Sequence, residues 1–121
     1  MENVGGNMRT MILAATLAVL SSSLAYADDV MASRYGNTTI ATDSKGVQTK
    51  IYYNADGTLS GKQGTLSFKG TWNVAKGEVC LHTSIAVPGM AEPFCRPVAA
   101  RKVGETWKAG DRTVTLVSGI Q

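Results

Sequence analysis

The sequence contains few of the residues on which metal, redox and phosphate chemistry depend. Its 121 residues include one histidine and two cysteines, so a structural zinc site would lack its fourth ligand. The two cysteines are not spaced as C-x-x-C, the arrangement typical of a redox pair. No segment combines a nucleophile with a base, and none has the pattern of a phosphate-binding loop. The sequence therefore predicts no metal, no cofactor and no particular reaction. It is informative about fold and location instead.

Charged residues make up 17% of the chain and are scattered through it. Twelve Lys and Arg residues against nine Asp and Glu residues give a formal net charge of +3, and the longest basic run is Arg101-Lys102. Nucleic acids and anionic membranes are bound by clustered positive charge. We therefore expect a slightly basic, solvated surface and no nucleic-acid partner.

A long hydrophobic run is missing as well. The apolar region at residues 11–20 is about half as long as the roughly 20 residues that a membrane-spanning helix needs. It follows Arg9 and precedes Ala25-Tyr26-Ala27, which has the A-x-A pattern of a cleavage site. We predict that residues 1–27 are an export signal cleaved after Ala27, and that the product is periplasmic or secreted with no integral membrane segment. Met8 is an alternative start to Met1.

Residues 28–121 are predicted to form a single domain. A chain of this size buries only about two thirds of its unfolded surface, so a covalent cross-link would add useful stability. Thiols of exported chains oxidise and pair, and we therefore expect a disulfide between Cys80 and Cys95. Closing a loop of about 15 residues stabilises the folded state by roughly 3 kcal/mol in the chain-entropy model.

Short segments of alternating apolar residues predict β-strands through most of this domain. The clearest example has apolar residues and glycine on one face, which is predicted to be buried: Leu66, Phe68, Gly70, Trp72 and Val74. The predicted strands, separated by turn signals such as Asp56-Gly57, are residues 38–42, 47–53, 58–61, 66–74, 78–85, 94–99, 106–108 and 112–117. About eight short strands predict an all-β fold, either a small antiparallel β-barrel or a sandwich. Closure into a barrel would remove exposed strand edges.

Residues 70–80 read as G-x-W-x-V-x-x-G-x-x-C, and a second cysteine follows in a Phe-Cys context. This pattern resembles small exported bacterial proteins grouped as a domain of unknown function. The Tyr-Gly-Asn-Thr segment at 35–38 and the Ala-Asp-Gly-Thr turn at 55–58 are similar too. The resemblance implies a periplasmic β-rich domain and carries over no catalytic residue. The aromatic residue that members commonly have after the first cysteine is missing from residues 82–85.

His82 and Arg96 are the only pair of residues that suggests catalysis. His82 lies two positions after Cys80 and therefore on the same side of its predicted strand. A general base needs a substrate cleft and an orienting carboxylate, and the sequence reveals neither. Copper binding by His82 with Met31 and Met90 is imaginable, because soft ligands suit Cu(I), but no motif brings these three residues together.

Aromatic residues supply the remaining candidates. Tyr52 and Tyr53 are adjacent, so they face opposite sides of their strand, and one of them is expected to be exposed. Together with Lys50 and Lys62 they form a candidate ligand or partner patch. Two tryptophans, Trp72 and Trp107, are expected to be core residues, and Trp72 is predicted to lie at the centre of the core, with Gly70 leaving room for its indole.

Three classes of function are compatible with these patterns. The first is a binding or interaction module of the cell envelope, with an envelope protein or a small ligand as its partner. The second is a periplasmic protease inhibitor, which would use residues 28–37 as an arm or residues 88–93 as a rigid loop. The third is a small enzyme that uses His82. We favour the first class, because the sequence lacks catalytic motifs.

Overall fold

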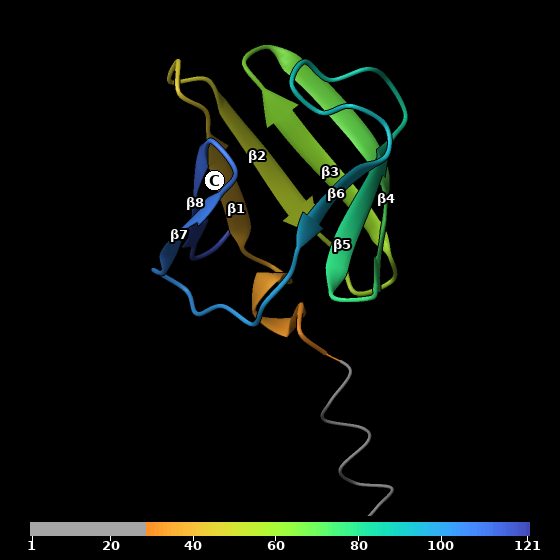
Figure 1. The fold of residues 1–121 in the computed structure, drawn as a ribbon, viewed down its shortest axis with the longest axis vertical. Coiled ribbons are helices and arrows are strands. Elements are labelled where there is room, and N and C mark those ends of the chain that lie inside the picture. The colour runs from red at the N-terminus through yellow and green to blue at the C-terminus, as the bar shows by residue number, and fades with distance from the viewer. Residues whose placement is uncertain (1–28) are drawn as a thin grey trace, which may run out of the picture.

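The computed structural model describes residues 29–121, and the predicted export signal lies outside them. Eight antiparallel strands form one sheet that curls into a nearly closed barrel (Figure 1). This confirms the predicted all-β fold. Within the described residues, no helix has the length and apolar character needed to cross a membrane. The elements are η1 (Ala32–Arg34), β1 (Thr38–Thr42), β2 (Gln48–Tyr53), β3 (Thr58–Gln63), β4 (Leu66–Ala75), β5 (Glu78–Thr83), β6 (Phe94–Pro97), β7 (Thr106–Ala109) and β8 (Arg112–Val117).

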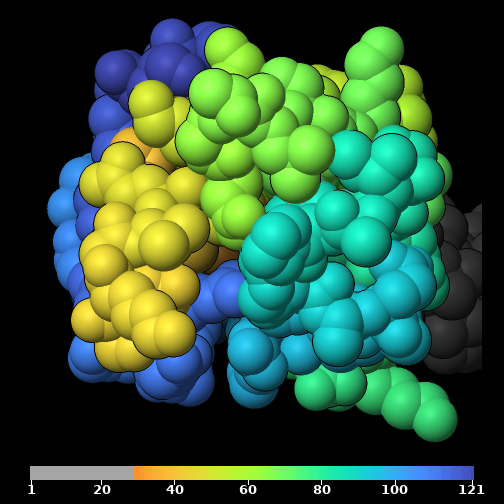
Figure 2. All heavy atoms as spheres, turned by 90° about the horizontal axis from the view of Figure 1, so that it is seen from above, coloured from red at the N-terminus to blue at the C-terminus, as the bar shows by residue number. Residues whose placement is uncertain are grey.

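The strand order is β6-β5-β4-β3-β2-β1-β8-β7. Each strand from β1 to β5 pairs with the next strand along the chain, while β8 returns to pair with β1. The sheet therefore has two edges, β6 and β7, which do not pair with each other. Figure 2 looks down on the barrel end that carries the β1–β2 turn. A recess separates this turn from the loop after β5, residues 84–93.

The long strand β4 follows the predicted alternation at its beginning but not at its end. Phe68 is buried, as expected for a residue on the inner face, but Trp72 is half-buried at the margin of the core rather than at its predicted centre, and Val74 is 40% exposed. The prediction that Val74 is buried is wrong. The β3–β4 ladder ends at the pair Thr58 and Thr71, so beyond this point β4 is flanked by β5 alone. With a neighbour on one side only, Val74 is not covered.

Two glycines allow strands and side chains to approach closely. A Cβ atom at Gly61 would lie 2.2 Å from Cζ of Phe68, so this glycine makes room for the buried phenyl ring. At Gly70 a Cβ atom would lie 2.1 Å from the backbone oxygen of His82. Gly70 therefore accommodates the backbone of β5, rather than the Trp72 indole that the sequence pattern led us to expect.

Strands β5 and β6 end two residues earlier than predicted, at Thr83 and Pro97. Pro97 pairs with Glu78, the first residue of β5, so β6 ends where the strand that it pairs with begins. Cys80 and Cys95 are direct partners in the β5–β6 ladder, and a disulfide joins their Sγ atoms. The cross-link therefore fastens the edge strand β6 to the body of the sheet.

Candidate functional site

The two candidate catalytic residues lie on opposite faces of the sheet. Arg96 pairs directly with Val79, which is 7% exposed, so its side chain points into the barrel. His82 lies on the outer face and is exposed. The structure does supply the carboxylate that the sequence did not reveal, because Nδ1 of His82 lies 2.8 Å from Oε1 of Glu92. Oε2 of Glu92 accepts the Thr83 N–H, so this carboxylate anchors the loop after β5 to the strand. His82 and Arg96 are not brought together.

The candidate tyrosine and lysine patch is divided by the sheet. Tyr53 is 6% exposed and faces the barrel interior. Tyr52 lies on the outer face, where its hydroxyl donates to the backbone oxygen of Gln121 at 2.7 Å. Lys50 and Lys62 are direct partners in the β2–β3 ladder and share that outer face. Three members of the patch are therefore neighbours, while Tyr53 belongs to a different site.

Tyr53 lines a cavity of about 70 Å³ inside the barrel, between the edge strands β6 and β7. We call it the arginine cavity, because three arginines line it, and no Asp or Glu is among its lining residues. Its polar walls are Arg34, Thr39, Tyr53, Arg96 and Arg112, and its apolar walls include Phe94, Trp107, Ala109 and Val114. Residues from η1, β1, β2, β5, β6, β7 and β8 thus converge on one point.

Arg34 is the most buried of the three arginines, at 5% exposed. Its Nη1 and Nη2 atoms donate to the backbone oxygens of Val30 and Ala99, at 3.3 and 3.2 Å. Its guanidinium carbon lies 5.6 Å from the centre of the Trp107 ring. Burial lowers the pKa of Arg34 from its ordinary value, but an arginine remains charged at neutral pH. A full positive charge is therefore held inside the barrel against neutral carbonyls.

Arg96 and Arg112 both lie against the Phe94 ring, with their guanidinium carbons 4.6 and 5.2 Å from its centre. Nη2 of Arg112 also donates to the backbone oxygen of Gly89, in the loop after β5. Nε of Arg96 is buried and has no hydrogen-bond partner. Buried donors are normally satisfied. The Arg96 N–H group is therefore an unused donor beside the arginine cavity.

Two hydroxyl groups are further potential hydrogen-bond donors at the arginine cavity. Oγ1 of Thr39 is buried and has no hydrogen-bond partner, and the residue is 6% exposed. Burial raises the pKa of Tyr53 to about 12, so its hydroxyl remains protonated and able to donate. The arginine cavity thus combines fixed positive charge with several donors and lacks a carboxylate.

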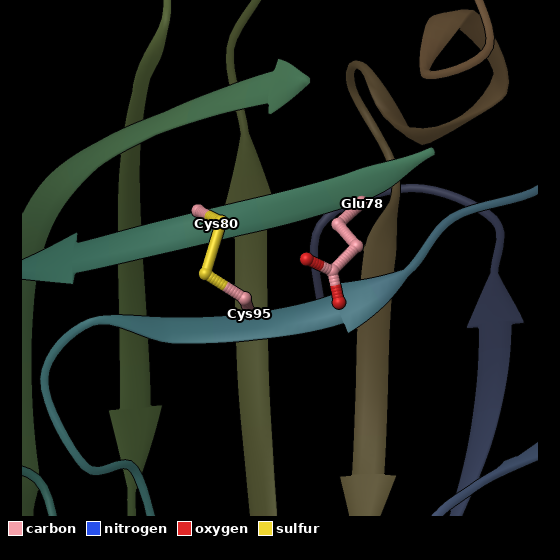
Figure 3. A group of neighbouring side chains, drawn as sticks. All are labelled: Glu78, Cys80 and Cys95. Atoms are coloured by element: carbon pink, nitrogen blue, oxygen red, sulfur yellow. A yellow bond between two sulfur atoms is a disulfide. The ribbon is translucent and has the colours of Figure 1, made fainter. Parts of the chain in front are cut away.

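Glu78, Cys80 and Cys95 form a cluster of potential metal ligands among the described residues (Figure 3). They lie on the outer face of the β5–β6 pair, away from the arginine cavity. The two sulfur atoms are bonded to each other, and a metal binds the thiolate form of cysteine. One carboxylate remains, so this cluster carries no argument for a metal centre.

Comparison of the chain with models of known protein families finds no match, and comparison with curated proteins finds none either.

Proposed function

We propose that the chain is an exported β-domain of the cell envelope that acts by binding a ligand rather than by catalysis. The arginine cavity is the observation that carries this proposal. A buried donor without a partner costs free energy, about 1 to 3 kcal/mol for a neutral group. Three buried side-chain donors of the described residues lack a partner, and two of them, Oγ1 of Thr39 and Nε of Arg96, belong to residues that line this cavity, whereas the third is Nε of Arg101. A ligand that accepts hydrogen bonds from the two cavity donors accounts for them.

Two observations favour binding over catalysis. The arginine cavity contains neither a carboxylate nor a histidine that could move a proton. The one His–carboxylate pair of the described residues, His82 with Glu92, is solvent-exposed and lies on the outer face.

The disulfide and the signal-like sequence at residues 1–27 support export, because disulfides persist in oxidising compartments.

A protease inhibitor is the alternative, and the loop after β5 bears on it. This loop is held firmly, because Glu92 is bonded to Thr83 and the Gly89 oxygen accepts from Arg112. An inhibitory loop must also present side chains to the protease. Val87 and Met90, the largest apolar side chains of residues 87–93, are instead 4% and 5% exposed and belong to the core cluster, although Pro88, Ala91 and Pro93 are exposed. This inward packing favours the ligand-binding proposal.

Export predicts a specific mature N-terminus. We expect that the full chain, produced in a bacterial host, is recovered from the periplasm with Asp28 as its first residue. Intact-mass measurement of the recovered protein checks this. Replacing both Ala25 and Ala27 by bulky residues should block cleavage, and this double variant serves as the control. Protein found only in the cytoplasm with an intact N-terminus would contradict export.

Ligand binding predicts where small molecules act on the protein. We would titrate the purified protein with a set of neutral, cationic and anionic small molecules and record two-dimensional amide NMR spectra. At least one of them is expected to shift the signals of Thr39, Tyr53 and the Trp107 indole, because these residues line the arginine cavity. The outer-face residues Lys50 and Tyr52 are internal controls. If none of the molecules shifts the cavity signals, the binding proposal is wrong.

A further inference from the structure

We propose that the arginine cavity binds the carboxylate group of a small organic acid. This inference deepens the ligand-binding function proposed above and rests on it. It assigns the unpartnered Nε of Arg96 and Oγ1 of Thr39 as donors to the ligand, because both residues line the same cavity of about 70 Å³.

Charge is the first argument for an anion. Arg34, Arg96 and Arg112 line the arginine cavity together, and no acidic residue does. The nearby acids are engaged elsewhere: Glu105 accepts hydrogen bonds from Arg101 and from the Lys102 N–H, and Asp43 accepts from the N–H groups of Lys45 and Val47. A buried charge is expensive unless an opposite charge lies close to it. A bound anion would provide that charge.

Hydrogen-bonding chemistry is the second argument. A carboxylate accepts through two oxygens, and the groups that line the polar side of the arginine cavity are guanidinium and hydroxyl donors. Hydrogen bonds between a guanidinium and a carboxylate are charge-assisted and stronger than neutral ones. A cationic ligand would meet three positive charges, and a neutral amide would leave them uncompensated.

Size and wall chemistry restrict the class of acid. A volume of about 70 Å³ is several times the roughly 10 to 15 Å³ that one water needs, yet it is well below the roughly 300 Å³ at which drug-sized sites begin. Only a short acid fits. Phe94, Trp107 and Val114 form the apolar side of the cavity, which suits a small hydrocarbon body. Inorganic phosphate has no such body to place against these residues.

The experiment compares matched acids and amides on the purified full chain. Acetate and propionate would be titrated by amide NMR beside acetamide, propionamide and inorganic phosphate. We expect at least one carboxylate to shift the signals of Thr39 and the Trp107 indole saturably, and its amide to leave them unchanged.

Variants locate the interaction. Arg96→Gln is expected to weaken carboxylate binding about tenfold or more, because it removes a charge-assisted donor. Thr39→Val removes only a hydroxyl, and we expect it to weaken binding several-fold. Thr39→Val also allows the contribution of the cavity to affinity to be measured if Arg96→Gln does not fold. Lys108→Gln is the matched control, because it removes the same charge from the exposed, outer side of β7. It should leave the affinity unchanged.

Each contrary result has a distinct meaning. If a neutral or cationic molecule shifts the cavity signals and the carboxylates do not, the binding function stands and the carboxylate inference is wrong. Binding of phosphate alone also overturns the inference, as does an equal loss of affinity in Lys108→Gln and Arg96→Gln. If nothing shifts the cavity signals, the inference and the proposed function fail together.

Discussion

Replacing Trp72 with alanine is expected to lower the free energy of unfolding by about 3 kcal/mol. The indole packs edge-on against Tyr53, with ring centres 6.0 Å apart, and lies 6.1 Å from Tyr35. Its Nε1 donates to the backbone oxygens of Asn54 and Thr58, each at 3.0 Å. The alanine variant loses both the packing and the hydrogen bonds. Urea unfolding followed by far-UV circular dichroism measures the loss.

Two further variants make this prediction specific. Trp72→Phe retains an aromatic ring but loses the N–H donor, so we expect a smaller loss. Trp107→Ala is also expected to cost less, because that indole lies against the guanidinium groups of Arg34 and Arg101, and cation–π contacts contribute about 0.5 to 2 kcal/mol. Wild-type stability of Trp72→Ala would show that the indole is not packed, and a ligand-stacking role would then explain it better.

The second prediction concerns the disulfide. Replacing Cys80 or Cys95 with serine is expected to lower the free energy of unfolding by about 2 to 5 kcal/mol. The cross-link removes conformations from the unfolded chain, and in the folded state it holds β6, which has four residues and pairs with β5 alone. Urea unfolding of wild-type protein and of both serine variants checks the size of the effect.

Reductant provides the control for this prediction. Adding dithiothreitol should lower the stability of wild-type protein and should not change that of a variant in which both cysteines are alanine. Thiol labelling of the native protein without reductant gives an independent measurement. Two reactive thiols under those conditions would contradict the prediction, because paired cysteines do not react.

The strands could be predicted from the sequence because their alternation of apolar and polar residues is local. The same alternation separates Tyr52 from Tyr53, and it also places Arg96 on the face opposite Cys95, as the structure has them. The position of Trp72 was predicted less well. It lies at the margin of the core, half-buried, rather than at its centre, because β3 no longer covers β4 beyond Thr71.

The arginine cavity could not be predicted, because it depends on long-range closure of the barrel. Arg34 lies in a short 3-10 helix whose sequence has no pattern that reveals which side chain is buried. Arg112 shares the inner face with Val114, but the alternation does not show that β8 pairs with β1. The His82–Glu92 contact was missed for a similar reason, since it depends on the path of the loop after β5.

The pairing of β1 with β8 has a consequence for the order of folding. The other six ladders of the described residues join strands that follow one another in the chain. The β1–β8 ladder instead joins Thr38 to Val117, and the entropy lost on loop closure grows with the number of residues enclosed. The hairpins are therefore expected to form early and the β1–β8 ladder late in the folding transition. The arginine cavity would then be among the last parts of the molecule to assemble.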